Sequence, residues 1–94
     1  MRNKFYVYII QSKKKDLFYI GYTENLTQRL KAHNRGISTF TRLKGPWDLI
    51  WYCVFPYRDQ ALEFERYLKS HTGRIFIYKR IINPAEHSGD GRPD

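Results

Sequence analysis

The feature that most constrains the fold is a pair of short segments near the start of the chain. Residues 5–10 and 17–20 are dense in aromatic and β-branched side chains, which favour β-strands, and the loop between them is polar and rich in lysine. A short polar loop between two such segments is typical of an antiparallel hairpin. We therefore predict that the chain opens with a β-hairpin.

The hairpin brings two tyrosines together. If Ile10 pairs with Leu17, then Tyr8 falls opposite Tyr19, and the alternation of side chains along each strand places both phenols on one face of the sheet. This prediction depends on the register, because a slip of one residue would send the two phenols to opposite faces.

A helix is predicted directly after the hairpin. Gly21 ends the second strand, and Thr23 or Asn25 can cap a helix over residues 26–34, with Gly36 as its stop signal. On this helix, the spacing of the residues places the apolar and the cationic side chains on different faces. Leu26 and Leu30 face the sheet, while Arg29 and His33 lie on an adjacent face that presents cations.

Two further elements complete the predicted domain. After a basic segment, residues 47–55 read as a third strand, and Asp59 can cap a helix over residues 60–70. Residues 74–82 have an ambiguous period, which we interpret as helix. The core stripe of the helix over 60–70 comprises Ala61, Phe64 and Leu68.

The length of 94 residues suits one folding unit. We predict a single α+β domain over residues 1–82, with helices flanking a three-stranded sheet. Residues 83–94 lack large apolar side chains and are predicted to form a disordered polar tail. The single cysteine, Cys53, lies in the predicted third strand, so an intrachain disulfide or a cysteine-based zinc site is excluded.

The charge of the chain points to a polyanionic partner. The net charge is +8, and residues 1–82 carry 16 Lys and Arg against 6 Asp and Glu. Such an excess favours nucleic acid through counterion release, although many small basic proteins bind none. No run approaches the roughly 18 apolar residues of a membrane span, and the start of the chain lacks a secretory signal, so we expect a cytoplasmic protein without membrane association.

Several short motifs occur in a fixed order along the chain. In that order and spacing they resemble the GIY-YIG nuclease family, above all its small stand-alone bacterial members and the nuclease domain of the excision-repair incision subunit. The resemblance covers residues 4–69 and continues toward residue 82. The matching elements are Tyr6-Val7-Tyr8, Tyr19-Ile20-Gly21, Asn25-Leu26, Arg29, Leu30, His33-Asn34, Ala61-Leu62, Glu65 and Lys69.

This resemblance implies metal-dependent hydrolysis of DNA on a three-stranded antiparallel sheet. Glu65 would hold one divalent cation, Mg²⁺ or Mn²⁺, and a single carboxylate suits Mg²⁺ because that ion keeps much of its water shell. Arg29 would stabilise charge on the phosphate in the transition state by bidentate hydrogen bonds. Tyr19 is the candidate general base, Tyr8 would orient the water or the phosphate, and His33 would share the proton transfer. Which tyrosine loses its proton stays open.

The motif departs from the family pattern at two places. Tyr6-Val7 stands where the family name has Gly-Ile, and Tyr22 stands where the excision-repair relatives carry a lysine. The candidate contacts to nucleic acid are basic or polar residues in loops and on helices. They are Lys13, Lys14, Lys15, Tyr22, Asn34, Arg42, Lys44 and Lys69.

The first functional class is an endonuclease that acts on DNA, including branched or damaged DNA, with structural selectivity or weak sequence specificity and a role in DNA repair. Two other functional classes remain open. The domain could bind nucleic acid without efficient cleavage, using exposed aromatics such as Trp47 or Trp51. It could also be a nuclease subunit whose specificity comes from a protein partner. Taken singly, Tyr8 and Tyr19 are ordinary strand residues, and Glu65 is an ordinary surface partner for Lys69.

Overall fold

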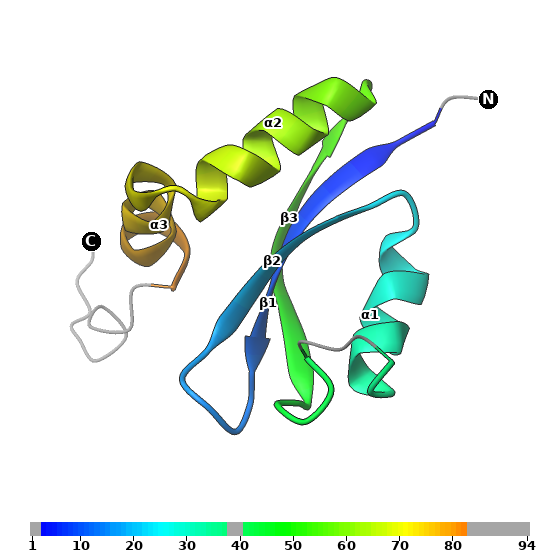
Figure 1. Ribbon diagram of the computed structural model, residues 1–94, viewed down its shortest axis with the longest axis vertical. Coiled ribbons are helices and arrows are strands. Elements are labelled where there is room, and N and C mark those ends of the chain that lie inside the picture. Colours follow the sequence, from blue (N-terminus) through cyan, green and yellow to red (C-terminus); the bar gives the residue numbers. More distant parts are fainter. Residues whose placement is uncertain (1–2, 38–40, 83–94) are drawn as a thin grey trace.

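The protein folds around one small sheet with helices on both faces (Figure 1). The computed structural model describes residues 3–37 and 41–82. The predicted tail at residues 83–94 lies outside them. In chain order the elements are β1 (Phe5–Ser12), β2 (Phe18–Thr23), α1 (Leu26–Asn34), β3 (Trp47–Phe55), α2 (Arg58–Lys69), α3 (His71–Ile77) and a π-helical turn, η1 (Tyr78–Ile82). The predicted α+β class with a three-stranded antiparallel sheet is confirmed.

The strand order is β2-β1-β3, and both pairings are antiparallel. The predicted pairing of Ile10 with Leu17 is wrong by two residues, because Ile10 pairs with Tyr19 and Tyr8 pairs with Gly21. The strand runs on to Ser12, whose side-chain oxygen accepts the next turn's backbone N–H groups. A shift of two residues preserves the faces, so both phenols still lie on one side of the sheet.

Each face of the sheet has its own core. On one face, Val7, Ile9 and Ile20 pack with α2 and α3, whose fully buried residues are Ala61, Leu68 and Ile77. On the other face, buried Tyr8, Ile10 and Trp47 pack with Leu26 and Leu30 of α1. The ribbon shows α1 on the opposite side of the sheet from α2 and α3 (Figure 1). The alternation of side chains in β1 therefore divides the molecule into two layers of different composition.

Helix α1 has the predicted bounds. Asn25 is its N-cap, and the Asn25 Oδ1 atom accepts the backbone N–H of Gln28 at 3.1 Å. Just beyond its end, Gly36 has a φ of +80°, a conformation that glycine adopts without steric cost. The cap residue and the stop residue thus both act as the sequence indicates.

Strand β3 also has the predicted bounds, but Trp47 differs from expectation. It was expected to be an exposed aromatic, and it is 2% exposed. The Trp47 backbone N–H donates to Asn34 Oδ1 at 2.7 Å, and its indole Nε1–H donates to the carbonyl of Thr41 at 3.0 Å. These bonds satisfy its polar groups inside the α1-side core, so Trp47 is a structural residue.

Helix α2 begins earlier than predicted. Its N-cap is Tyr57, which makes no side-chain cap bond, and Asp59 lies in the first turn, where a carboxylate complements the helix dipole. The following helix was expected after Gly73 and instead begins at His71, because Ser70 caps it through the N–H of Gly73. None of the helices in residues 3–37 and 41–82 has the length and apolar character needed to cross a membrane.

At Gly73, α3 packs tightly against the backbone at the end of α2. A Cβ at this position would overlap the carbonyl of Tyr67 and the Cα of Leu68. We expect Gly73→Ala to lower the free energy of unfolding in urea by about 3 kcal/mol, because backbone atoms must move to accept it. Thr72→Ala, at an exposed neighbouring position, is the control, and equal stability of the two variants would contradict the tight contact.

Candidate active site

The two motif tyrosines meet a histidine on the α1 side of the sheet. Tyr8 and Tyr19 have ring centroids 6.3 Å apart, and the His33 ring lies 5.8 Å from Tyr8 and 5.0 Å from Tyr19. Tyr8 comes from the central strand, Tyr19 from the edge strand and His33 from the last turn of α1. Residues 25 positions apart in sequence thus form one aromatic cluster.

Gly21 makes room for Tyr8 within this cluster. It stands directly opposite Tyr8 in the β1–β2 pairing, and a Cβ on Gly21 would overlap the Cζ and Oη atoms of the phenol. The absence of a side chain lets the Tyr8 ring lie across β2. The glycine of the second motif is therefore required by the position of the tyrosine of the first.

A hydrogen-bonded chain runs inward from Tyr8. The Tyr8 Oη atom lies 2.7 Å from His33 Nε2, and His33 Nδ1 lies 2.8 Å from Thr41 Oγ1. His33 is 1% exposed, so its predicted place on a face that presents cations is wrong. The reason is that the α1 face bearing His33 turns toward the sheet and the loop before β3, which both supply hydrogen-bond partners.

Burial sets the protonation of the Tyr8–His33 pair. Burial first, and the positive charge of Arg29 second, hold the pKa of His33 below its ordinary value, so the ring is neutral near pH 7. Burial and the nearby Tyr19 raise the pKa of Tyr8 well above the usual range for a phenol, and Arg29 opposes this through its charge and a hydrogen bond. Tyr8 therefore stays protonated near neutral pH.

Arg29 lies on the outer side of the cluster. It belongs to the exposed part of α1 and lines an open groove of about 660 Å³. Lys31 and Arg35, two basic residues that our sequence reasoning did not select, line the same groove. Their spacing of four residues on a helix would have indicated a shared face. The remaining lining residues are Thr23, Asn25, Thr27, Gln28, Ala32 and Ile37.

Glu65 approaches from the helical layer on the other face of the sheet. Its side chain is 20% exposed, and its Oε2 atom lies 3.0 Å from Lys69 Nζ, one helical turn away. The carboxylate raises the pKa of Tyr8 and that of Tyr22, although it is among the smaller causes at both residues. Lys69 is thus placed beside Glu65, as a partner for the carboxylate.

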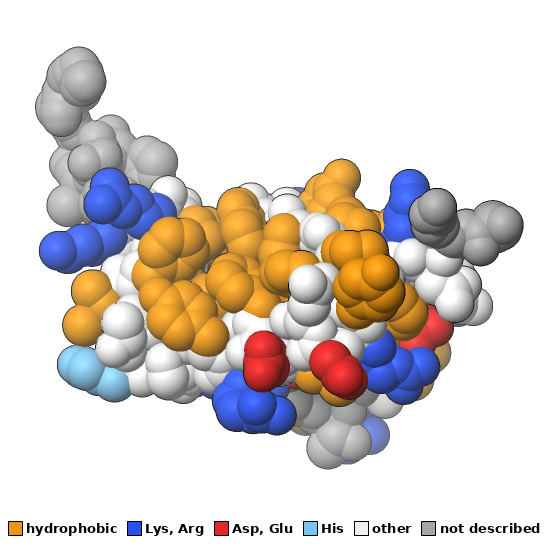
Figure 2. Space-filling view, turned by 90° about the horizontal axis from the view of Figure 1, so that it is seen from above, with side chains coloured by type: hydrophobic (Ala, Val, Ile, Leu, Met, Phe, Trp, Pro, Cys, Tyr) orange, Lys and Arg blue, Asp and Glu red, His pale blue; other side chains and the backbone are white. Residues whose placement is uncertain are grey.

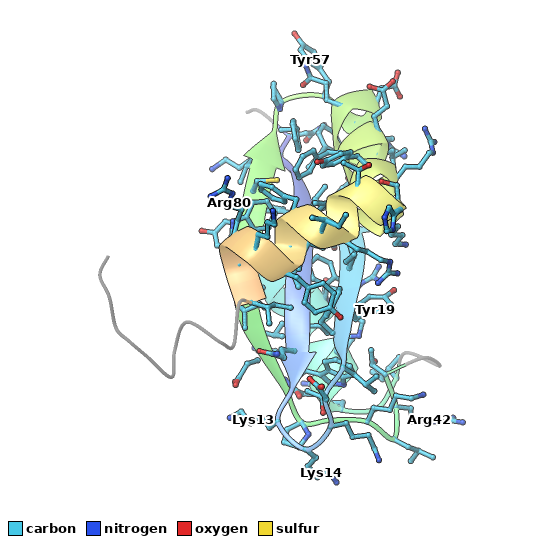
Figure 3. All side chains as sticks on the ribbon, turned by 90° about the vertical axis from the view of Figure 1, so that its left-hand side faces the viewer. Lys13, Lys14, Tyr19, Arg42, Tyr57 and Arg80 are labelled. Carbon is cyan, nitrogen blue, oxygen red and sulfur yellow. The ribbon has the colours of Figure 1, made fainter. Side chains whose placement is uncertain are left out.

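The predicted contacts of the hairpin and the loop before β3 gather at one end of the molecule. Figure 3 shows Lys13, Lys14 and Arg42 at that end, and Arg80 in another region. Lys14 and Arg42 line a hollow together with His33 and Asn34, while Lys13 pairs with Asp48 at 3.3 Å. Lys15 is exposed in the same turn, and the backbone carbonyl of Lys44 accepts the Ser12 hydroxyl at 2.6 Å.

Two predicted contacts have structural partners. Both polar atoms of the Asn34 amide bond the backbone of Trp47, with Nδ2 donating to the carbonyl at 3.2 Å. Tyr22 lies on the α2 side of the sheet, where its hydroxyl donates to Glu24 at 3.1 Å and Glu24 also pairs with Arg58 at 2.9 Å. The structure therefore does not bring Tyr22 to the tyrosine–histidine cluster.

Residues 4–79 match the family model of the GIY-YIG catalytic domain. The chain belongs to the GIY-YIG family. It is 41% identical over 68 residues to a UPF0213 protein of Clostridium perfringens, an alignment that covers 71% of this chain and 72% of the relative. It is 36% identical over 73 residues to a UPF0213 protein of Haloquadratum walsbyi, covering 77% of this chain and 81% of the relative.

A solved structure shares the GIY-YIG fold seen here. The solution NMR structure of a UPF0213 protein from Bacillus halodurans superposes with a TM-score of 0.52 at 30% identity and covers 90% of this chain and 93% of that one. Family membership places the chain among nucleases, which act on nucleic acid and generally use a divalent metal ion. Three of the motif residues of this GIY-YIG chain, Tyr8, Tyr19 and His33, form the cluster.

Glu65 is the carboxylate of the candidate site that would hold a metal ion. In the part of the chain that the structure describes, no three His, Cys, Asp or Glu side chains converge into a closed metal cage. Glu65 is partly exposed, and its ion pair with Lys69 uses one of its two oxygens. This donor set fits a hard cation that keeps most of its water ligands, such as Mg²⁺, and not a structural zinc ion.

His33 makes the stability of the domain depend on pH. Because its pKa is depressed by folding, the unfolded chain takes up a proton as the pH falls through about 6.5 while the folded chain resists it. The stability linked to His33 is thus complete above that pH and declines below it. We expect urea unfolding to show a smaller loss of stability between about pH 7.5 and pH 5.5 in His33→Gln than in wild type.

The matched control for that substitution is His71→Gln, at an exposed position of α3. An unchanged pH dependence in His33→Gln would contradict the assignment of a neutral, buried ring.

Proposed function

We propose that this protein is a metal-dependent endonuclease that hydrolyses phosphodiester bonds in DNA, with structural selectivity or weak sequence specificity. The observation that carries the proposal is the single cluster of Tyr8, Tyr19 and His33 beside the exposed Arg29. Three groups able to donate or accept protons thus adjoin one permanent cation. That combination suits attack on a phosphodiester, which needs both a proton acceptor and a stabiliser of negative charge.

Arg29 binds the scissile phosphate in this proposal. Its guanidinium presents a planar fork of N–H donors, and Lys31 and Arg35 line the same groove, so three positive charges attract a phosphate there. Hydrogen bonds from Arg29 strengthen as charge builds on the phosphate oxygens. This strengthening lowers the barrier because it is greater in the transition state than in the bound substrate.

Tyr19 is the proposed general base. Burial keeps Tyr8 protonated, so the half-buried Tyr19 is the phenol positioned to take a proton from the attacking water. Tyr8 and His33 hold the inner side of the site in a fixed geometry through their 2.7 Å hydrogen bond.

Glu65 is the residue that would hold a divalent cation in this site. When bound, such a cation supplies charge neutralisation at the phosphate and a more acidic water. The influence of the Glu65 charge on the pKa of Tyr8 supports a location within electrostatic reach of the cluster. To serve as a ligand, the carboxylate exchanges part of its ion pair with Lys69 for the metal.

A nucleic-acid-binding module without efficient cleavage is the second candidate. The observation that favours it is the ion pair between Glu65 and Lys69, which occupies the single carboxylate proposed as metal ligand. A third candidate, a subunit completed by a protein partner, draws support from the exposed hydrophobic side chains that Figure 2 shows gathered on one face. Phe55, Phe64 and Tyr67 line a hollow in the region of α2 and β3.

A nicking assay on supercoiled plasmid and on branched, flapped and single-stranded oligonucleotides, with Mg²⁺, Mn²⁺ or chelator, tests the nuclease directly. We expect Tyr19→Phe, Arg29→Ala and Glu65→Ala each to lower the cleavage rate by about 100-fold or more while binding persists, because each removes a group that acts in the transition state.

The matched controls in this assay are Glu63→Ala, an exposed carboxylate of the same helix, and Tyr52→Phe, an exposed tyrosine of β3. Both are expected to cleave like wild type. Metal-independent binding with no cleavage of any substrate by wild type would favour the binding module over the nuclease.

The basic end of the molecule is tested by salt titration. Lys14→Ala and Arg42→Ala are each expected to weaken binding of a labelled oligonucleotide and to reduce the slope of log affinity against log salt by about one, since each removes one phosphate contact. Arg80→Ala, in another region of the surface, should keep the wild-type slope. Equal losses in all three variants would show that the contacts are spread over the whole surface.

A further inference from the structure

The turn before β3 exposes a leucine between two cations. Leu43 is 81% exposed, the largest exposed fraction of any large hydrophobic side chain in residues 3–37 and 41–82. Arg42 precedes it, Lys44 follows it, and Leu43 lines the same hollow as Lys14 and Arg42. Contacts inside the domain leave most of this side chain in water, so its apolar surface is available to a partner that meets this end of the molecule.

Hydrogen bonds to the core hold this turn at both ends. The backbone N–H of Lys44 donates to the carbonyl of Thr41 at 3.2 Å, which closes the turn around Leu43. The carbonyl of Thr41 also accepts the indole N–H of Trp47, and the carbonyl of Lys44 accepts the hydroxyl of Ser12 at 2.6 Å. Because the turn is already ordered, Leu43 can enter a binding site with little further loss of backbone entropy.

The turn packs beside the end of α1 that borders the Arg29 groove. A Cβ on Gly36 would lie 3.3 Å from the Cγ atom of Arg42, so the Arg42 side chain lies against the backbone just after α1. The neighbours of Gly36 in the chain, Arg35 and Ile37, line the groove that also contains Arg29. The turn and the proposed phosphate site are therefore parts of one basic surface around the C-terminal end of α1.

The surroundings of Leu43 favour nucleic acid as the partner at this surface. Arg42 and Lys44 flank it in the turn, and Figure 3 shows Lys14 of the hairpin at the same end of the molecule as Arg42. Cations on both sides of an apolar side chain match a strand of nucleic acid, in which phosphates border the stacked bases. The cations can then bind phosphates while the leucine contacts the faces of bases. Aliphatic side chains in DNA-binding proteins insert between bases in this way and unstack them.

The energetic cost of inserting Leu43 between bases selects the kind of DNA. An inserted side chain must overcome the stacking of the bases that it separates, so insertion is favoured where stacking is already interrupted, as at a branch point or flap junction. We propose that Leu43 is a wedge that inserts at the branch point of branched DNA, while Lys14 and Arg42 bind the adjoining phosphates. The wedge names the DNA feature that the proposed nuclease selects, and only its effect on cleavage rests on that function.

The fluorescence of 2-aminopurine, which rises when this base unstacks, tests the wedge in the presence of chelator, where no metal-dependent cleavage occurs. The base is placed at the branch point of a flapped oligonucleotide or in the middle of an unbranched duplex. We expect wild type to raise the fluorescence at the branch point and not in the duplex. Leu43→Ala should abolish that rise and weaken binding of the flapped DNA about tenfold, because one buried leucine is lost, while binding of the duplex changes by less than about twofold. Leu43→Met keeps the apolar volume and should keep the wild-type rise and affinity.

Ile75→Ala is the matched control, since Ile75 is another exposed aliphatic side chain, on α3. This variant is expected to behave like wild type on both DNAs. No rise at the branch point with wild-type protein, or an unchanged rise with Leu43→Ala, would overturn the proposal. Equal weakening of flapped and duplex DNA in Leu43→Ala would show a general contact in place of a wedge and would refute it too.

An anionic lipid surface is the alternative partner for an apolar side chain among cations. Cosedimentation with vesicles of phosphatidylserine and phosphatidylcholine tests this alternative, and we expect Leu43→Ala to behave like wild type in it. Vesicle binding that depends on Leu43, together with DNA binding that does not, would refute the wedge.

The cleavage assay separates this proposal from the proposed nuclease. We expect Leu43→Ala to raise KM for the flapped substrate about tenfold with kcat within about twofold, because the wedge binds substrate and takes no part in the chemical step. A rise in fluorescence that depends on Leu43, from a wild-type protein that cleaves no DNA, would support the wedge and refute the nuclease. Cleavage of flapped DNA without any rise would refute the wedge and support the nuclease.

Discussion

The placement of the Tyr8 phenol across the backbone of Gly21 is the contact on which the rest of the site depends. A phenol is large, and the central strand of a three-stranded sheet has neighbours on both sides, so space exists only where the facing residue lacks a side chain. Once the ring lies there, its oxygen meets His33, and the helix carrying His33 is fixed relative to the sheet. Hydrogen bonds between side chains thereby join β1, α1 and the turn before β3.

In the core on the α1 side of the sheet, polar contacts replace part of the apolar packing. On the α2 side, Val7, Ile9, Ala61 and Leu68 form an ordinary hydrophobic layer. On the α1 side, Tyr8 and His33 are buried with their polar atoms paired, which avoids the large cost of an unsatisfied group. The first layer stabilises the domain by hydrophobic burial, and the second holds functional groups in a defined geometry.

The strands and helices could be predicted from the sequence where local signals agreed. Asn25 and Gly36 set the ends of α1, and the aromatic run set β3, because caps and strand propensity act within a few residues. The hairpin register was missed because the Ser12 side chain holds the turn, a role that composition does not reveal. From the sequence, Gly73 was expected to precede the last helix. In the structure it packs against the backbone at the end of α2, a tertiary contact that the local sequence does not reveal.

For the site, the family resemblance indicated Tyr8, Tyr19, Arg29, His33 and Glu65 by spacing alone, and family membership is confirmed. The roles of these residues stay predictions. Sequence could not tell that His33 is buried and neutral, because helical spacing gives a face but not what covers it. It also could not reveal Thr41, a single threonine eight residues beyond His33 in a loop without a regular period.

The position of β2 at one edge of the sheet limits how this domain can assemble. Both Tyr19 and Gly21 lie on β2, whose outer edge has no strand partner among the described residues. A chain that added a strand at that edge would lie beside β2, the strand that carries Tyr19, the proposed general base. Strand addition along β2, whether in a dimer or with another protein, would therefore place the added backbone next to the proposed site, whereas addition along β3 would leave β1 and β3 between the added strand and β2.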